Sequence, residues 1–478
     1  MLTEPLNPLI REKKGDQFCF RLKRSNNRPR RLLDGLNERA KDKASPMPVE
    51  NSRLGGFFRH SVAERREIVS KMAGLTPEQT EALRACGELD ETAANRMIEN
   101  VIGTMSLPVG IATNFVIDEK HYLIPFCLEE SSVVAAASNM AKRCLANGGF
   151  RSNNDAPLMI AQLQVLECSN PEEAANALHD ASDELMALCN SLPSTMIRLG
   201  GGCKRIETRT IESLSGPMVI LHIIVDCRDA MGANAVNTMA ELIAPRVEEL
   251  TSGRVHLKIL SNLAVHRLAR IEATFTPEEL ADDGTKTNGE AVIEGILEAH
   301  HFAVADPFRA ATHNKGVMNA ISSVGLACGQ DWRAIEAGCH AYAAYGKEHY
   351  GSMTNWYKDD AGNLIGQIET PMAVGIVGGA SKVHPAAQAN LAILGVESAQ
   401  ELAGVIAASG LAQNLGALRA LATRGIQAGH MKLHSRNMAV SAGAVGEEIE
   451  TIAKRLQAVD GPKTQTVVEE LLKALRTE

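Results

Sequence analysis

The stretch from residue 157 to residue 262 limits the fold of this chain more than any other part of the sequence. Its apolar patterning predicts strands and helices in the order β-α-β-β-α-β, over 157–168, 171–189, 203–211, 217–227, 229–251 and 254–262. That order is the split βαβ arrangement of a ferredoxin-like unit. Pro245 lies inside the second predicted helix and is expected to kink it. At about 105 residues, the stretch has the size of one domain.

Helical patterns dominate on both sides of this unit. Helices are expected at 61–73, 76–86, 90–101, 133–146, 288–304, 331–345 and from 385 onward, with strand-like residues at 123–128 and 366–377. If the two flanking regions pack together, the ferredoxin-like unit is an insertion in a larger, mainly helical domain. We therefore expect an α+β protein with a large domain of residues 57–156 and 263–424, a small domain of residues 157–262, and a helical C-terminal part of residues 425–478.

Residues 1–56 are expected to form a flexible basic extension, because their apolar residues show no sustained period. The first 50 residues carry a net charge of +5, whereas the whole chain carries −8. A solvated arm is the simpler interpretation of this segment, and contact with an anionic partner is the alternative.

Composition narrows the functional classes. The 478 residues are 45% hydrophobic and 22% charged, which excludes disorder of the whole chain. The net charge of −8 and the 4% of aromatic residues argue against a nucleic-acid binder. No apolar run approaches the roughly 18 residues that cross a membrane, so we expect a soluble, cytoplasmic protein without a membrane partner. Ten cysteines without a CxxC predict reduced thiols.

One glycine-containing run has the setting of a phosphate site. The chain has neither GxGxxG nor GxxxxGK[ST], but the run Asp229-Ala-Met-Gly-Ala-Asn234 follows a predicted strand and opens a helix. The N–H groups of a helix N-terminus attract anions, and Gly232 would permit close approach of a phosphate. The alternative is that Asp229 is only the N-cap of the helix.

Acidic and basic residues at three further places are candidates for catalysis. Glu129 and Glu130 follow an apolar strand, where burial would raise a carboxyl pKa and suit it to proton delivery, although a solvated turn is the simpler interpretation. Lys315 lies among small and polar residues and could stabilise an oxyanion, with Asp331 holding its charge. The alternative is a surface lysine and an N-capping aspartate.

A histidine pair stands near the C-terminus. His430 and His434 are four residues apart and would share one face of a helix. The glutamate of the HExxH zinc motif is missing, because Met431 follows the first histidine, and no metal is expected. A histidine that protonates a leaving group is the favoured interpretation.

Taken together, these segments resemble the 3-hydroxy-3-methylglutaryl-CoA (HMG-CoA) reductases, in particular their soluble, bacterial class II branch. The resemblance runs from about Phe57 to the C-terminus, and its motifs occur in the order of the family. The matching runs are Glu99-Asn-Val-Ile-Gly103, Glu129-Glu130, Asp229–Asn234, Thr312-His-Asn-Lys-Gly316, Asp331-Trp-Arg333 and Gly429-His430.

The resemblance implies roles for the domains and for individual residues. The small domain would bind a dinucleotide, the large domain would bind an acyl-CoA, and residues 425–478 would form a mobile flap. The implied catalytic residues are Glu130, Lys315, Asp331 and His430. The implied substrate-binding residues are Arg59, Ser132, Asn262, Arg309 and Asn319. The implied cofactor-binding residues are Asp229, Met231, Gly232 and Asn234.

The implied cofactor is NADH or NADPH. Relatives that use NADH carry an aspartate that grips the adenosine ribose, and an ungapped match places Pro193 there. Arg198, Lys204 and Arg205 follow closely, which favours NADPH slightly by leaving room for a 2′-phosphate.

The resemblance further implies the reaction and the partners. HMG-CoA would be interconverted with mevalonate and CoA by two hydride transfers, in a homodimer or larger homo-oligomer with sites at the dimer interface. Two alternatives remain at this stage. A CoA-thioester hydrolase or acyltransferase would use Cys203 or Cys328 as its nucleophile, and a CoA-binding relative would lack catalysis.

Overall fold

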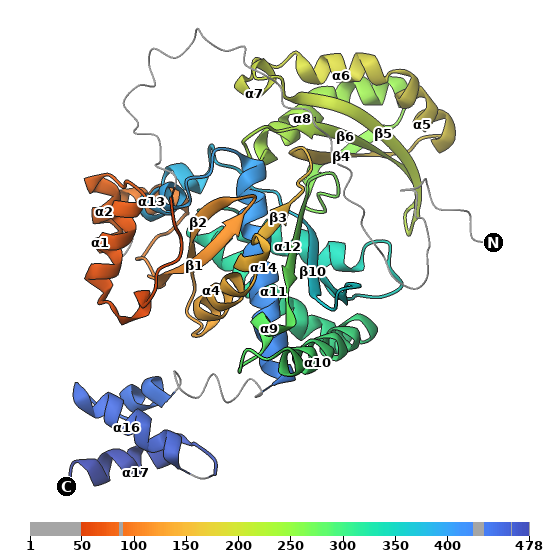
Figure 1. Ribbon diagram of the computed structural model, residues 1–478. Helices are drawn as coiled ribbons and strands as arrows, with labels where there is room; N and C mark the ends of the chain where they lie inside the picture. Colours follow the sequence, from red (N-terminus) through yellow and green to blue (C-terminus); the bar gives the residue numbers. More distant parts are fainter. Residues whose placement is uncertain (1–48, 86–88, 424–434, 460, 478) are drawn as a thin grey trace. The chain divides into compact units, whose positions relative to one another are not determined.

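The computed structural model describes residues 49–85, 89–423, 435–459 and 461–477. In these ranges helices and strands alternate along the chain, and the strands form two β-sheets (Figure 1). One sheet has four strands and belongs to the region of residues 157–262, and the other has six strands drawn from both flanking regions. The fold is therefore of the α+β class, as the sequence predicts.

The small domain is a ferredoxin-like unit. Its elements are β4 Leu158–Leu166, α5 Pro171–Asp180, α6 Ser182–Asn190, α7 Thr195–Arg198, β5 Gly202–Ser213, β6 Gly216–Asp226, α8 Ala233–Thr251 and β7 Arg254–Ser261. The strand order is β5-β6-β4-β7, and every neighbouring pair is antiparallel. This is the strand order that the predicted β-α-β-β-α-β sequence produces.

Two details of the small domain differ from the sequence prediction. The helix expected over 171–189 is broken at Ala181, which ends α5 and begins α6. The second helix begins at Ala233 rather than at Asp229, because Gly232 at φ +102° serves as its N-cap. Pro245 lies inside this helix, as expected.

The large domain is built around a six-stranded sheet of order β2-β1-β3-β8-β10-β9. Its strands are β1 Val109–Ile117, β2 Lys120–Cys127, β3 Phe150–Ser152, β8 Leu268–Phe275, β9 Thr354–Lys358 and β10 Leu364–Pro371. The first three precede the small domain in the chain and the last three follow it. They join where β3 pairs antiparallel with β8, so the small domain is an insertion between two paired strands. The expectation of a mainly helical domain overlooked this sheet.

Helices cover the sheet of the large domain. They are α4 Val133–Arg143, α9 Pro277–Leu280, α10 Lys286–Ala305, α11 Pro307–Ala327, α12 Trp332–Ala344, α13 Pro385–Leu394 and α14 Ala399–Ala422, and the 3₁₀ turns Leu145–Asn147 and Ala380–Lys382 lie between them. α14 packs against α4, α10 and α11. Gly410 lets it approach α11 closely, because a Cβ there would lie 2.8 Å from the Ile321 side chain.

α14 is also the one helix in the described ranges that is long and apolar enough to cross a membrane by length and composition. Two thirds of its most apolar window is buried inside the protein (67%), which is the setting of a core helix. It falls within the helical segment that the sequence predicts from residue 385 onward.

Short helices precede β1. They are the 3₁₀ turn Phe57–Arg59, α1 Val62–Met72, α2 Pro77–Arg84 and α3 Glu91–Met97. Ser61 and Thr76 form capping boxes at the starts of α1 and α2, and Asp90 caps α3. These caps confirm the helix starts that the sequence predicts.

The C-terminal helices have a hydrophobic cluster of their own. α16 spans Glu447–Ala458 and α17 spans Gln465–Leu475. Ile452, Leu456 and Val468 are fully buried within this cluster.

Candidate active site

Glu130 and Lys315 form a direct ion pair. The Nζ atom of Lys315, on α11, donates a hydrogen bond to Oε2 of Glu130 across 2.6 Å. Glu130 follows the end of β2, and 185 residues separate the two along the chain. The Lys315 side chain is 60% exposed and the Glu130 side chain is 37% exposed. The pair therefore places a carboxylate and an ammonium side by side on an accessible surface.

The turn that carries Glu130 has an unusual backbone. Ser132 adopts a left-handed conformation, at φ +75°, directly before α4, and its side chain makes no capping hydrogen bond. Val133 and Ala137 on α4 are buried, which fixes the start of this helix. Non-glycine residues in this conformation are often found at functional sites. The structure thus places Ser132 two residues from Glu130, in a turn that the packing of α4 determines.

Three of the predicted site residues lie on α11. Lys315 and Asn319 are four residues apart and share one helix face. Arg309 lies in the first turn, after the N-cap Asp306. Burial lowers the pKa of the Arg309 guanidinium from its ordinary value. In the described ranges this guanidinium makes no ion pair, so its charge is available to an anionic ligand.

A buried polar network holds α11 in place. Nε2 of His313 lies 2.8 Å from the Thr354 hydroxyl and 3.1 Å from the Asn414 amide nitrogen. Oδ1 of Asn414 also accepts a hydrogen bond from Nε1 of Trp356. Burial lowers the pKa of His313 to about 3, so the ring is neutral at ordinary pH. The network joins α11 to β9 and α14 on the side away from Lys315.

Asp331 is the N-cap of α12. Its carboxylate accepts a hydrogen bond from the N–H of Ala334 at 3.1 Å and lies 3.5 Å from the guanidinium of Arg333. Within the described residues, Asp331 and Lys315 share neither a hydrogen bond nor an ion pair. The capping alternative is confirmed, whereas a catalytic role for Asp331 stays a prediction.

The Asp229–Asn234 run is shaped by contacts outside α8. Oδ1 of Asp229 accepts the N–H of Ala399, at the start of α14, and its backbone oxygen accepts the N–H of Ile376. Asp229 is therefore not the N-cap of α8, and that alternative is wrong. Gly232 takes this place without a side-chain cap, and a Cβ on it would lie 2.2 Å from the Cys227 sulfur. The N-terminus of α8 is thus left without a side-chain cap.

A buried arginine holds this run against the large domain. Nη1 of Arg267 donates to the carbonyl oxygens of Ala230 and Met231, and Nη2 donates to that of Val374. Arg267 is 4% exposed, and burial lowers its pKa to about 10. Sequence reasoning missed this residue, because nothing in its neighbourhood marks it as buried.

Within the described residues, the remaining predicted residues make no hydrogen bond or ion pair with Glu130 or Lys315. The backbone oxygen of Asn262 packs against α12, where a Cβ on Gly338 would lie 2.6 Å from it. Arg59 is exposed and stacks on the Phe58 ring at 5.5 Å. Asn234 is exposed on the first turn of α8. His430 lies outside the described residues.

The cysteines of the alternative readings are buried. Cys328 is fully buried, which raises its pKa far above the ordinary value. Cys203 is 4% exposed and lies in the core of the small domain beside Cys189. Neither thiol is placed to attack a thioester from solvent.

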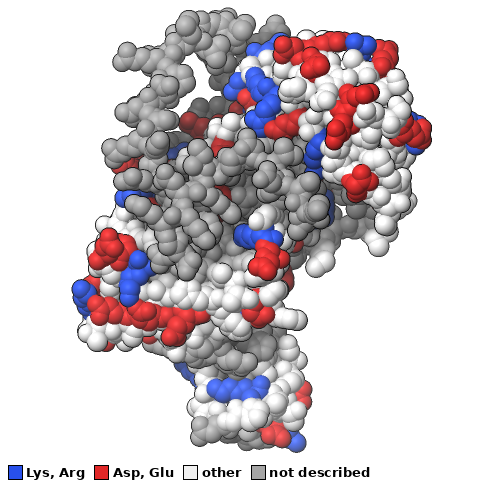
Figure 2. Space-filling model, turned by 90° about the vertical axis from the view of Figure 1, so that its right-hand side faces the viewer, with Lys and Arg blue, Asp and Glu red and all other residues white. Residues whose placement is uncertain are grey.

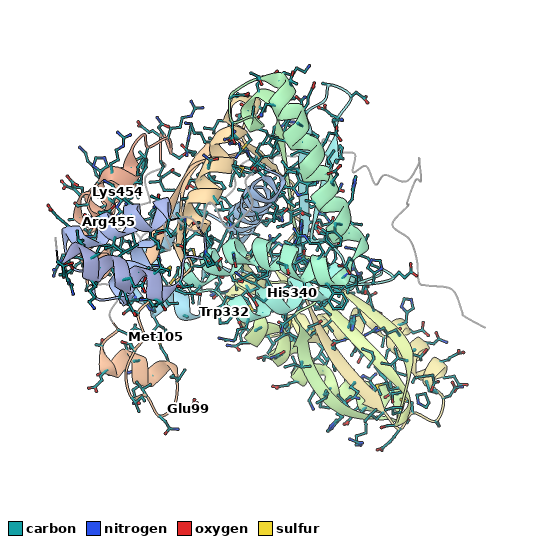
Figure 3. The ribbon with its side chains drawn as sticks, turned by 90° about the horizontal axis from the view of Figure 1, so that it is seen from below. Glu99, Met105, Trp332, His340, Lys454 and Arg455 are labelled. Carbon is teal, nitrogen blue, oxygen red and sulfur yellow. The ribbon has the colours of Figure 1, made fainter. Side chains whose placement is uncertain are left out.

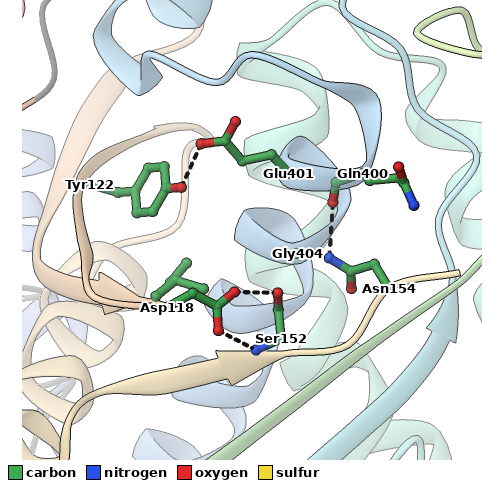
Figure 4. A pocket seen from close by; sticks show the side chains of 8 residues that line it. Asp118, Tyr122, Ser152, Asn154, Gln400, Glu401 and Gly404 are labelled. Carbon is green, nitrogen blue, oxygen red and sulfur yellow. Dashed lines mark hydrogen bonds between the residues drawn. The ribbon is translucent and has the colours of Figure 1, made fainter. Parts of the chain in front are cut away.

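A polar cavity of about 280 Å³ lies at the opposite end of the β1–β2 hairpin from Glu130 (Figure 4). Its polar groups bond to one another: Asp118 to Ser152, Tyr122 to Glu401, and Asn154 to the backbone of Gln400. None of the predicted site residues lines it. This cavity is therefore not the site that the sequence predicts.

Several known proteins share the sequence pattern and the fold of this chain. The family model described as hydroxymethylglutaryl-coenzyme A reductase matches residues 61–435. The 3-hydroxy-3-methylglutaryl-coenzyme A reductase of Archaeoglobus fulgidus is 51% identical over 427 residues, which cover 89% of this chain and 95% of that protein. A probable enzyme of the same name from Borreliella burgdorferi is 34% identical, over 80% of this chain and 85% of that protein.

Solved structures agree with these relatives. A 3-hydroxy-3-methylglutaryl-coenzyme A reductase of Streptococcus pneumoniae superposes with a TM-score of 0.75 at 36% identity, covering 88% of this chain and 99% of that one. A class II structure from the same organism, bound to NADPH in open conformations, gives a TM-score of 0.73 over 87% of this chain and 100% of that one.

Proposed function

The chain belongs to the hydroxymethylglutaryl-coenzyme A reductase family, and we propose that the Glu130–Lys315 pair is its catalytic centre. The protein is an oxidoreductase that uses a nicotinamide cofactor. The reaction reduces the CoA thioester of HMG-CoA to the alcohol mevalonate, in two hydride additions with release of CoA. Each addition places negative charge on the carbonyl oxygen, so a catalyst needs a fixed cation and a proton donor at that oxygen. The contact between Lys315 and Glu130 is the observation that carries the proposal.

Lys315 stabilises the oxyanion in both reduction steps. Its ammonium has three donors, of which one binds Glu130 in this structure. The other two are free to reach a carbonyl oxygen that lies over the exposed face of the pair. Because the charge is already in place before the reaction, little reorganisation is needed as the oxyanion forms.

Glu130 donates the proton to the aldehyde oxygen. Its carboxyl touches the ammonium that binds the oxyanion, so a proton carried on Glu130 has a short path to the aldehyde oxygen. Asp331, at the start of α12, keeps Lys315 charged, and His430 protonates the departing CoA thiolate. Closure of residues 425–478 over the site would bring His430 in and exclude water.

The substrate is held by residues around this pair. The guanidinium of Arg309, which has no ion-pair partner among the described residues, binds the free carboxylate of the HMG group. Ser132 and Asn319 supply hydrogen bonds beside Glu130 and Lys315. Arg59 binds a phosphate of CoA, and Asn262 contacts the substrate from the junction of the small domain with α12.

The cofactor is NADPH, bound at the start of α8 by Asp229, Met231, Gly232 and Asn234. Support comes from the uncapped N-terminus of α8, where Gly232 brings the backbone N–H groups into the open, and from the pneumococcal relative that is bound to NADPH. When bound, each dinucleotide would supply one hydride, so two molecules bind in turn during one reduction of HMG-CoA. The protein's part is to hold its diphosphate at the helix N-terminus, on a loop that Arg267 fixes to the large domain.

The working unit is a homodimer with the site at its interface, in the cytoplasm. An exposed apolar segment follows α3, with Ile98, Ile102 and Met105 open to solvent, and Phe308 beside Arg309 is also exposed. Glu99 and Met105 are labelled on this segment in Figure 3. Clusters of exposed apolar side chains are typical of protein interfaces. A second copy covering them would bring its own residues close to the active site.

Replacing Glu130 by glutamine tests the proposal, with the neighbouring Glu129→Gln as a matched control. Glu129 is exposed, one residue away, and outside the ion pair. Glu130→Gln should lower mevalonate formation from HMG-CoA by about 100-fold or more, while Glu129→Gln stays close to the parent. Equal rates for the two variants would overturn the assignment.

A further inference from the structure

We propose that Lys204 and Arg228 form the site that recognises the 2′-phosphate of NADPH, with Arg198 at its edge. The inference rests on the proposed function, because it takes a nicotinamide dinucleotide as the ligand. It goes further by naming the groups that distinguish NADPH from NADH.

Two cations converge on one carbonyl oxygen. Nζ of Lys204, near the start of β5, donates to the backbone oxygen of Gly200 across 2.8 Å. Nη2 of Arg228, after the end of β6, donates to the same oxygen across 2.6 Å. A neutral carbonyl cannot neutralise either charge. The two heads are thus held side by side, with donors left over for an anion.

The backbone of Gly200 permits this arrangement. Its φ is +85°, a conformation that side chains rarely adopt, and a Cβ on it would lie 2.8 Å from Nη2 of Arg228. The adjoining Gly201 packs so closely that its Cβ would lie 2.7 Å from the backbone oxygen of Asp226. The glycine turn before β5 therefore brings Lys204 and Arg228 together, although 24 positions separate them in the sequence.

The local charge balance is positive. Arg228 has one carboxylate nearby, Oδ2 of Asp226 at 3.6 Å, and that side chain is mostly buried. Within the described chain Lys204 makes no ion pair, and Arg198 donates only to the Thr195 hydroxyl, at 2.8 Å. On the face that Figure 2 shows, Lys and Arg side chains lie beside Asp and Glu side chains at several places. A cluster of exposed cations with one shielded acid fits a dianionic group.

Arg205 is excluded from this site. Its Nε donates to Glu207 across 2.7 Å, and its Nη2 lies 3.3 Å from Nε2 of His266. Its charge is therefore already paired. The sequence grouped Arg205 with Arg198 and Lys204 by proximity alone and omitted Arg228, which only the fold brings to Gly200.

The cluster lies at the same end of the sheet as the expected diphosphate site. Gly202 at the start of β5 pairs with Asp226 at the end of β6. Arg228 directly precedes Asp229, which opens the loop to the uncapped N-terminus of α8. One dinucleotide can thus lie with its diphosphate at α8 and its adenosine ribose toward Gly200.

The first test measures binding without turnover. Adenosine 2′,5′-bisphosphate and 5′-AMP are titrated by calorimetry into the full-length protein and into its Lys204→Gln and Arg228→Gln variants. Charge-assisted contacts to phosphate predict about 10-fold weaker binding of the bisphosphate per variant, and a smaller change for 5′-AMP. The control is Arg209→Gln, an exposed arginine farther along β5, which should leave both affinities unchanged.

The second test uses kinetics. Lys204→Gln should raise the KM for NADPH relative to the KM for NADH by about 10-fold, without an equal loss in kcat. The inference is overturned if Lys204→Gln has the same ratio of KM for NADPH to KM for NADH as the parent and binds adenosine 2′,5′-bisphosphate with the parent's affinity. A parent protein that oxidises neither cofactor in the presence of HMG-CoA overturns the proposed function instead. Lys204 lies on β5 and is exposed to solvent. The Lys204→Gln variant is therefore expected to fold even if Arg228→Gln does not.

Discussion

Arg267 should be the residue whose loss most directly uncouples the cofactor loop from the large domain. Replacing it by methionine keeps much of the side-chain volume but removes every donor. The carbonyl oxygens of Ala230 and Met231, which are half-buried, and of Val374, which is buried, then lose the donor that Arg267 supplies. The loop that Asp229 opens would keep the contacts of Asp229 with Ala399 and Ile376 but lose those that Arg267 makes farther along it.

The size of the effect follows from those three acceptors. A buried polar group without a partner costs about 1–3 kcal/mol, and the variant also regains the free energy once spent on desolvating the charge. A net loss of about 3 kcal/mol in the free energy of unfolding is expected for Arg267→Met. The KM for the reduced dinucleotide should rise as well, because the start of α8 is no longer fixed.

Urea unfolding of the parent, Arg267→Met and Arg254→Met measures this loss. Arg254 is half exposed and pairs with Glu167 on the surface, so its replacement should cost about 0.5 kcal/mol or less. If the two variants unfold with the same free energy, the reasoning about Arg267 is refuted.

Two further predictions concern stability and assembly. Burial lowers the pKa of His313 to about 3 and that of His300 to about 4, so the stability that these neutral rings carry is present above about pH 6.5 and is lost as the pH falls. The urea midpoint should therefore decrease between about pH 7.5 and pH 5, and His313→Gln should weaken this dependence; a midpoint that does not move contradicts the burial argument. Ile102→Asp should turn the proposed dimer into monomers in sedimentation experiments, since a charge would replace an apolar contact, and an unchanged oligomer would show that this segment lies outside the interface.

The sequence predicts the small domain well for a physical reason. Its strands and helices are amphipathic over their own length, so the order of elements can be read locally. The sheet of the large domain is different, because β3 has three residues and gains its place only by pairing with β8 across the inserted domain. Such long-range pairing leaves no local pattern.

The candidate site likewise has residues that the sequence predicts and contacts that only the fold shows. Glu130 and Lys315 were named by their motifs and by resemblance, but their contact joins positions 185 residues apart and had to be seen in the fold. Arg267 and Arg228 stand out by no sequence motif. Their roles arise from the glycine turn and the carbonyl groups that surround them. Local reasoning finds residue types that suit a chemistry, whereas the fold decides which of them meet.

The most direct test of the account is the rate of HMG-CoA reduction by Lys315→Ala, measured by oxidation of the reduced dinucleotide and by mevalonate formation. Loss of a donor that stabilises an oxyanion typically lowers kcat by about 100- to 1,000-fold, and this is the predicted result, with dinucleotide binding retained. A rate within about tenfold of the parent would contradict the claim that Lys315 stabilises the oxyanion.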